Sequence, residues 1–198
     1  MTQPMATTAK RPTRTVISRL LAVLVAAASL FTTLAFTSPQ AASAAPGPFY
    51  YIVAVHSGKP IMPINHTKSW GAEIVQADWQ NGGALHWKVR PSGTIGGEQR
   101  IRRFENRHSK YCISNHGASS VVVLTQRTCL VDYTWNEEWV VSSATNMWAG
   151  RSFTVWNNHS GLCMDVANAS TAAYARVGQY PCHGGTNQQF RLVYVQGT

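Results

Sequence analysis

Acidic residues are scarce in this sequence, with eight Asp and Glu among 198 residues. A glycoside hydrolase needs two carboxyl groups placed across the scissile bond. Glu137 and Glu138 are adjacent, so on a strand their side chains would point to opposite faces. Asp165 has no acidic neighbour in its part of the chain. The sequence therefore offers no pair of carboxylates for glycoside hydrolysis.

Other catalytic and metal-binding patterns are also missing. There is no Gly-x-Ser-x-Gly elbow, no His-Glu-x-x-His pair and no glycine-rich phosphate loop. No cysteine has a second cysteine two to four residues away, which argues against a zinc site. We therefore predict a protein that is not an enzyme and that uses no metal and no cofactor.

The sequence has only one long apolar run, and it lies near the start. Leu20 to Phe36 follows four basic residues and precedes a small-residue site at Ala42-Ser43-Ala44. This order is typical of a secretory signal, so we predict that residues 1–44 are removed and that residues 45–198 form a secreted, extracellular domain. A membrane anchor is the alternative, but the run is short and contains Ser29, Thr32 and Thr33. We expect no membrane attachment after cleavage.

Positive charge is present, but it does not dominate the predicted mature chain. That part holds 13 of the 17 Lys and Arg and all eight acidic residues, a formal charge of +5. Arg100, Arg102, Arg103 and Arg107 cluster around Phe104. They could bind an anionic cell-wall polymer or nucleic acid, or they could form the solvated face of a strand. We favour the solvated face and predict no nucleic-acid partner.

The sequence contains four cysteines, all after the leader. In an oxidising compartment they are expected to form disulfides, for which three connectivities exist. The separations of 17 residues (Cys112 to Cys129) and 19 residues (Cys163 to Cys182) are similar and favour those two pairs. Each disulfide would stabilise the fold by about 3 kcal/mol in the chain-entropy model.

An internal repeat organises the predicted domain. Ser57, Ser109 and Ser160 head similar segments at steps of 52 and 51 residues. The aromatic residues Trp87, Trp139 and Phe190 recur at the same steps, and we expect them in the core. The repeats span about 49–95, 96–148 and 149–198. Trp70, Trp135 and Trp148 fall outside the repeat, and we favour ordinary packing over a stacking role for them.

Short runs rich in Val, Tyr and Trp and bounded by Gly, Asn and Ser predict strands, whereas no helical period of ordinary length appears after the leader. About twelve short strands in three equal units indicate an all-β, closed architecture. Two segments, Ser92 to Gly97 and Ser142 to Gly150, are predicted to connect the copies. The expected strands lie at 50–55, 73–76, 100–105, 121–124, 139–141, 153–156, 176–179 and 190–193.

The third repeat carries the most specific motifs: Ser160-Gly161-Leu162-Cys163-Met164-Asp165-Val166 and Asn187-Gln188-Gln189-Phe190. With three copies and a Gln-x-Trp-like ending, the chain resembles the ricin-B-type lectin family from about Phe49 to Val195. The resemblance implies a β-trefoil fold and a carbohydrate partner of galactose type or xylan type. It also implies one shallow sugar pocket in each competent copy.

Carried over by position, the resemblance implies a sugar site in the third repeat. An ionised carboxylate can accept protons from two adjacent hydroxyls, and an amide can both donate and accept. An aromatic ring can cover the C–H face of a sugar. The predicted sugar-binding residues are Asp165, Tyr180, His183, Asn187 and Gln188, with Gln188 expected to hold Asp165 from behind.

One departure from the family pattern lies on the same strand. Many members have Gln two residues before the aromatic residue, where this chain has Gly178. Gln179 should point to the opposite face by strand alternation. One hydrogen bond to a sugar is therefore expected to be missing or to pass through water.

The first two copies are degenerate at the corresponding positions. Repeat two retains only Asn136 of the polar set, and repeat one retains none, so we predict one working site. A protein-binding or inhibitory role for the trefoil loops, with an unknown partner, is the alternative function, as is a cell-wall polyanion binder. The substituted positions are Met62, Ala77 and Ala84-Leu85 in repeat one, and Ser114, Arg127 and Asn136-Glu137 in repeat two.

Overall fold

The structure is a computed structural model that describes residues 49–130 and 135–197. The predicted signal at residues 1–44 lies outside the described residues. Within the described ranges, no helix has the length and apolarity needed to cross a membrane. The described residues all belong to one compact unit.

Six strands form a closed barrel. Each pairs antiparallel with two others, in the cyclic order β1, β4, β5, β9, β10, β13 and back to β1. Closure satisfies the backbone groups that an open sheet edge would expose. The barrel strands are β1 (Tyr50–Ala54), β4 (Trp87–Ile95), β5 (Glu98–Asn106), β9 (Trp139–Val141), β10 (Phe153–Asn157) and β13 (Gln189–Tyr194).

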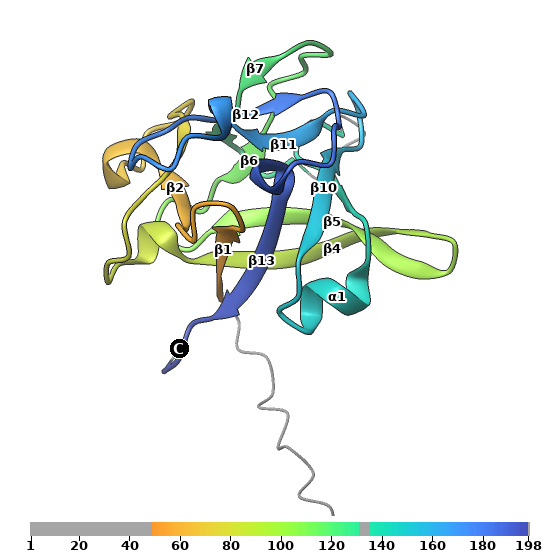
Figure 1. Cartoon of the computed structure of the whole chain (residues 1–198), viewed down its shortest axis with the longest axis horizontal. Coiled ribbons are helices and arrows are strands. Elements are labelled where there is room, and N and C mark those ends of the chain that lie inside the picture. Colours follow the sequence, from red (N-terminus) through yellow and green to blue (C-terminus); the bar gives the residue numbers. More distant parts are fainter. Residues whose placement is uncertain (1–48, 131–134, 198) are drawn as a thin grey trace, which may run out of the picture. The chain divides into compact units, whose positions relative to one another are not determined.

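Each repeat adds one hairpin beside the barrel (Figure 1). A further strand, β7 (Val122–Val123), pairs with β12 of the next repeat. The described residues thus hold thirteen strands in three similar units, which confirms the predicted all-β fold and its β-trefoil architecture. The hairpins are β2 (Ile61–Pro63) with β3 (Ile74–Gln76), β6 (Cys112–Ser114) with β8 (Thr125–Arg127), and β11 (Cys163–Val166) with β12 (Val177–Tyr180).

The repeated aromatic residues lie in the core, as predicted. Trp87, Trp139 and Phe190 are fully buried in one apolar cluster. The two indole nitrogens donate equivalent hydrogen bonds of 2.9 Å, from Trp87 to the Ile61 carbonyl and from Trp139 to the Ile113 carbonyl. Phe190 has no such donor, so the third repeat holds its core position by packing alone.

The repeated serines have a structural role that the sequence did not reveal. Ser57, Ser109 and Ser160 each donate from Oγ to the Oε1 of a glutamine in the same repeat, at 2.8, 2.6 and 2.7 Å. Those glutamines are Gln76, Gln126 and Gln179, all fully buried.

Each of these glutamines also joins its hairpin to another repeat. The Nε2 of Gln179 donates to the carbonyls of Ala118 and Ser120, which belong to repeat two. Gln126 likewise binds a loop of repeat one, and Gln76 binds a loop of repeat three. The Ser–Gln pairs therefore hold the three repeats together through buried hydrogen bonds, which are costly to leave unmade.

Both predicted connections contain regular structure. The prediction for Ser92 to Gly97 is wrong, because β4 continues to Ile95 and β5 begins at Glu98. Only Gly96 and Gly97 turn the chain, both at positive φ, so this long hairpin extends past the barrel (Figure 1). The segment Ser142 to Gly150 contains a short helix, α1 (Ala144–Trp148), which the Ser143 side chain caps.

The arginine cluster is not the solvated strand face that we expected. Arg102 is only 2% exposed and lies over the Trp148 ring, and Arg100 donates to the Val141 carbonyl. Arg103 pairs with Glu138, and Arg107 lies over the Phe49 ring. These arginines are engaged inside the domain, so they do not form an open basic patch.

Both disulfides of the favoured pairing are present. Cys112 is bonded to Cys129 and Cys163 to Cys182, with Cα–Cα distances of 5.0 and 5.1 Å. Each links the first strand of a hairpin to the segment after its second strand. Repeat one has Pro60 and Trp79 at these positions, so its hairpin has no disulfide.

Candidate functional site

The candidate site lies on the β11–β12 hairpin of the third repeat. Strand pairing places Asp165 opposite Gly178 and Cys163 opposite Tyr180. The short helix η4 (Thr186–Gln188) brings two amide side chains to the same hairpin. The Cys163–Cys182 disulfide ties the segment before η4 to β11.

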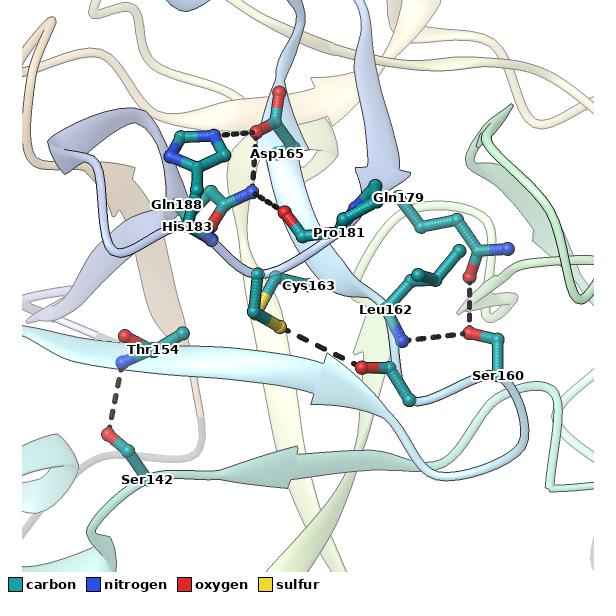
Figure 2. The surroundings of a disulfide bond; sticks show 12 residues. Ser142, Thr154, Ser160, Leu162, Cys163, Asp165, Gln179, Pro181, His183 and Gln188 are labelled. Carbon is teal, nitrogen blue, oxygen red and sulfur yellow. Dashed lines mark hydrogen bonds and ion pairs between the residues drawn. A yellow bond between two sulfur atoms is a disulfide. The ribbon is translucent and has the colours of Figure 1, made fainter.

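Asp165 is held by donors that converge on one of its oxygens. Its Oδ2 accepts hydrogen bonds of 2.9 Å from Asn187 Nδ2 and from Gln188 Nε2. His183 Nε2 lies 3.3 Å from the same oxygen, and Figure 2 shows how His183 and Gln188 meet Asp165. Among the described side chains, no donor contacts Oδ1. The carboxylate is thus fixed in orientation while one oxygen remains able to accept hydrogen bonds.

His183 has a defined tautomer in this arrangement. The Gly185 backbone N–H donates to His183 Nδ1 at 3.2 Å, so the proton of the neutral ring lies on Nε2. That proton faces Asp165. A Cβ at Gly185 would lie 2.7 Å from His183 Cε1 and 2.6 Å from Asn187 Oδ1, so a larger residue would force these two side chains to shift.

The Tyr180 ring is the exposed aromatic surface of the site. It is 48% exposed and meets the His183 ring edge-on, with centroids 6.1 Å apart. Asp165 is only 7% exposed, yet it lines the same open cavity of about 660 Å³. A cavity of this volume is in the range of small-molecule sites. Its other polar lining residues are His183, Asn187, Asn168, Arg176 and the buried Gln179.

The two amides of η4 differ in what they offer a ligand. Gln188 is fully buried and does not line the cavity. Its Nε2 donates to Asp165 and to the Pro181 carbonyl, and its Oε1 accepts from the His183 N–H. Gln188 therefore supports the site without reaching its surface. Asn187 lines the cavity, but its Nδ2 is used by Asp165 and the Val166 carbonyl, which leaves Oδ1 to accept.

One wall of the cavity comes from another repeat, which the sequence analysis missed. Val121, Val122 and Val123 of repeat two line it, and β7 pairs with Gly178 and Gln179 of β12. A Cβ on Gly178 would lie 2.8 Å from the Val122 carbonyl oxygen, so only glycine allows this approach. Gln179 points inward, as predicted, and is fully buried.

An ion pair lies at the edge of the cavity. Arg176 lines it and donates from Nε to Glu73 Oε2 of repeat one at 2.9 Å. All three repeats thus contribute to the surroundings of the site, although its polar residues come from the third.

The corresponding place in repeat one is filled with apolar side chains. Met62, Val75, Ala77 and Leu85 are buried together in a small separate cluster. In repeat two, Ser114 is buried and Arg127 stands opposite Cys112, where the third repeat has Tyr180 opposite Cys163. The described residues contain no group of three His, Cys, Asp or Glu side chains placed to hold a metal ion.

Comparisons with known proteins agree with this architecture. Residues 135–198 match a family described as ricin-type β-trefoil lectin domain-like. The designed threefold-symmetric protein ThreeFoil is 28% identical with a TM-score of 0.65, covering 75% of this chain and all of that one. No curated protein sequence matches this chain.

Two natural structures are more distant. An exo-β-1,3-galactanase from Clostridium thermocellum is 23% identical with a TM-score of 0.63, over 75% of this chain and 30% of the enzyme. The C-terminal half of an earthworm R-type lectin, in complex with GalNAc, is 18% identical with a TM-score of 0.57, over 75% of this chain and all of that one. Together with the family match, these likenesses confirm the resemblance predicted from the sequence.

Proposed function

From its likeness to the ricin-B-type β-trefoil lectins, we propose that this protein is a secreted, non-enzymatic lectin with one sugar site, in its third repeat. The site takes a terminal or exposed sugar residue of a glycan. A galactose-type sugar is the first candidate, and a xylan-type sugar is the second.

The observation that carries this proposal is the state of the Asp165 carboxylate. Oδ2 is fixed by Asn187 and Gln188, whereas Oδ1 contacts no described donor and the residue lines an open cavity. A carboxylate buried to this degree needs hydrogen bonds to compensate for lost hydration. Sugar hydroxyls would supply them at Oδ1, and hydrogen bonds to a charged acceptor are the stronger kind.

The neighbouring groups fit the other features of a sugar. The exposed Tyr180 ring can cover a C–H face, since an aromatic ring loses little conformational entropy on binding. Asn187 Oδ1 can accept from a further hydroxyl, and Val121, Val122 and Val123 give the cavity an apolar wall. His183 Nε2 lies 3.3 Å from Asp165 Oδ2, so its ring helps to hold the carboxylate in place.

The preference for galactose-type sugars rests on the relatives. The galactanase acts on β-1,3-galactan, as its name states, and the earthworm lectin structure contains GalNAc.

The test is calorimetric titration of the protein with galactose, GalNAc, lactose and xylo-oligosaccharides, comparing the native chain with Asp165→Asn. We expect one sugar per chain with a Kd on the order of 0.1–1 mM, equivalent to about −5.5 to −4 kcal/mol. Loss of the charged acceptor should weaken binding by roughly 1.5–3 kcal/mol.

Asp78→Asn is the matched control, because Asp78 is an exposed carboxylate of repeat one that pairs with Lys59. It should leave the sugar affinity unchanged. Three equivalent sugars per chain, or equal affinity of Asp165→Asn and the native chain, would contradict the proposed site.

A further inference from the structure

A second surface with its own chemistry lies where repeat one meets repeat two. We had expected Trp70 to be ordinary packing, but its side chain is 56% exposed. The guanidinium of Arg127 lies over the Trp70 ring, 4.3 Å from its centroid. We call the surface around this pair the basic junction patch, which consists of Lys68, Trp70, His108, Lys110 and Arg127.

Hydrogen bonds place these residues side by side. The loop that carries Lys68 and Trp70 is fixed to β8, because Gln126 Nε2 donates to the carbonyls of Thr67 and Ser69 at 3.0 and 2.8 Å. Lys110 precedes β6, which pairs with β8 through Cys112 and Arg127. Burial, together with the nearby positive charges of Lys68, His66 and Lys110, lowers the pKa of His108, so these groups lie within electrostatic range of it.

The described part of the chain holds no ion pair with this patch, although the buried Glu137 interacts electrostatically with Arg127. The ion pairs found there use other partners, and none involves Lys68, Lys110 or Arg127. Lys68, His108 and Lys110 are exposed. The ion-paired carboxylates are Asp78 with Lys59, Glu105 with Arg90, Glu138 with Arg103 and Glu73 with Arg176, while Asp165 has His183 as its neighbour.

Comparison with the third repeat shows that the place of the sugar site carries the opposite charge in repeat two. Arg127 takes the place of Tyr180, and the uncharged Ser114 takes the place of Asp165. The carboxyl group of Glu137 interacts with Arg127, but Glu137 is 3% exposed, and burial raises its pKa. Repeat two has therefore lost the features that suit a neutral sugar and presents cations beside an exposed aromatic ring.

We propose that the basic junction patch binds an acidic polysaccharide through its sulfate or carboxylate groups. The guanidinium of Arg127 is held over the Trp70 ring, and a guanidinium matches the geometry of such anions. Lys68 and Lys110, both exposed, add positive charge to the patch. A single-stranded nucleic acid is disfavoured, because the patch offers one aromatic ring with a face already covered by Arg127, and not a series of stacking platforms.

The test measures binding to heparin (sulfated), polygalacturonate (carboxylated) and dextran (neutral) at increasing salt concentrations. The variant Lys68→Gln/Lys110→Gln/Arg127→Gln removes three charges of the patch. The control Arg151→Gln/Arg191→Gln/Lys88→Gln removes three charges elsewhere, none of which has an ion-pair partner among the described residues. We expect roughly tenfold weaker binding to at least one acidic polymer for the patch variant, from three surface pairs of a fraction of a kcal/mol each.

Several results would overturn the proposal. These are no binding to either acidic polymer, equal losses for the patch and control variants, or tighter binding to a single-stranded oligonucleotide than to the polysaccharides. Binding should weaken with salt, because exposed charges are screened. The variant Asp165→Asn should bind the acidic polymers as the native chain does, so this outcome is independent of the sugar site. Thermal unfolding of each variant verifies that it is folded.

Discussion

Repeats one and three share the same framework, but the pocket is open in repeat three and filled in repeat one. Both have a buried Ser–Gln pair, Ser57 with Gln76 and Ser160 with Gln179, and both place a buried aromatic residue at the end of the unit. Their outer faces differ completely. Repeat three presents the carboxylate of Asp165 in an open cavity, whereas the cluster around Met62 fills the same place in repeat one.

The geometry of a strand explains how the pocket residues can change without affecting the residues that join the repeats. On β12 the side chain of Gln179 points into the domain, and its neighbours Gly178 and Tyr180 face the cavity. Along the strand, the residue that joins the repeats is thus the direct neighbour of residues that face the cavity. A repeat can lose its pocket residues and still contribute to a stable trefoil.

The largest expected effect comes from breaking the inter-repeat hydrogen bonds. Gln179→Ala leaves the Ala118 and Ser120 carbonyls and the Ser160 hydroxyl without this partner, and should cost roughly 3–5 kcal/mol of unfolding free energy. It should also weaken sugar binding, because these carbonyls lie next to the valine wall. Urea unfolding and calorimetric titration measure the two effects.

Gln126→Ala is the matched variant in repeat two. It should lose similar stability but keep the sugar affinity, since Gln126 holds the loop at Thr67 and Ser69, which does not line the cavity. If both variants weaken sugar binding equally, the wall from repeat two has no specific role in the site.

The two disulfides permit a second comparison. Replacing Cys112 and Cys129 by Ala, or Cys163 and Cys182 by Ala, should in each case cost about 3 kcal/mol, because the closed loops are of similar length. Only the second pair links the strand of Asp165 to the segment that carries His183. We therefore expect a reduced sugar affinity for the Cys163/Cys182 variant alone, measured under conditions where both variants remain folded.

A reduced affinity in the Cys112/Cys129 variant as well would indicate that the sugar site depends on the stability of the whole domain. An unchanged affinity in both would show that the hydrogen bonds of Gln188 suffice to position the site.

The fold and the candidate site differ in how much of them the sequence predicts. The period between Trp87, Trp139 and Phe190 is a long-range signal, and it predicts three units with buried aromatic ends. Cysteine spacing likewise favours the observed disulfides. Strand alternation correctly places Gln179 inside. These inferences depend on patterns within one repeat or on the period itself.

Features that depend on contacts between repeats are not visible in this way. From the sequence, Gly178 looks like the loss of a sugar-binding glutamine. The structure shows that the close approach of the Val122 carbonyl requires a glycine here. Burial of Arg102 is also missed, although its contact lies within repeat two: its guanidinium lies over the ring of Trp148, in α1. The wrong boundary at Ser92 to Gly97 has a local cause: Gly and Ser suggest a connection, but pairing with β5 extends β4 across them.

The smallest expected effect concerns Glu137 of repeat two, which stands where repeat three has the amide of Gln188. Burial raises the pKa of Glu137, although a hydrogen bond with Ser114 and the charges of Arg103 and Arg127 oppose the shift. The folded protein thus binds this proton more tightly than the unfolded chain does. Stability contributed by the protonated form is complete below the ordinary pKa of about 4.5 and is lost as the pH rises through the higher folded value.

Glu137→Gln removes this titration and places an amide where repeat three has one. Near pH 7 we expect the variant to be more stable than the native chain by roughly 0.5–1 kcal/mol, a common gain for a stabilising substitution. The difference should shrink as the pH falls toward 4, where both side chains are neutral. Urea unfolding at both pH values measures it, with Glu98→Gln at the exposed hairpin tip as the control. A variant less stable than the native chain at pH 7 would mean that ionised Glu137 is held by Arg103 and Arg127, so that repeat two keeps its carboxylate as a structural anion.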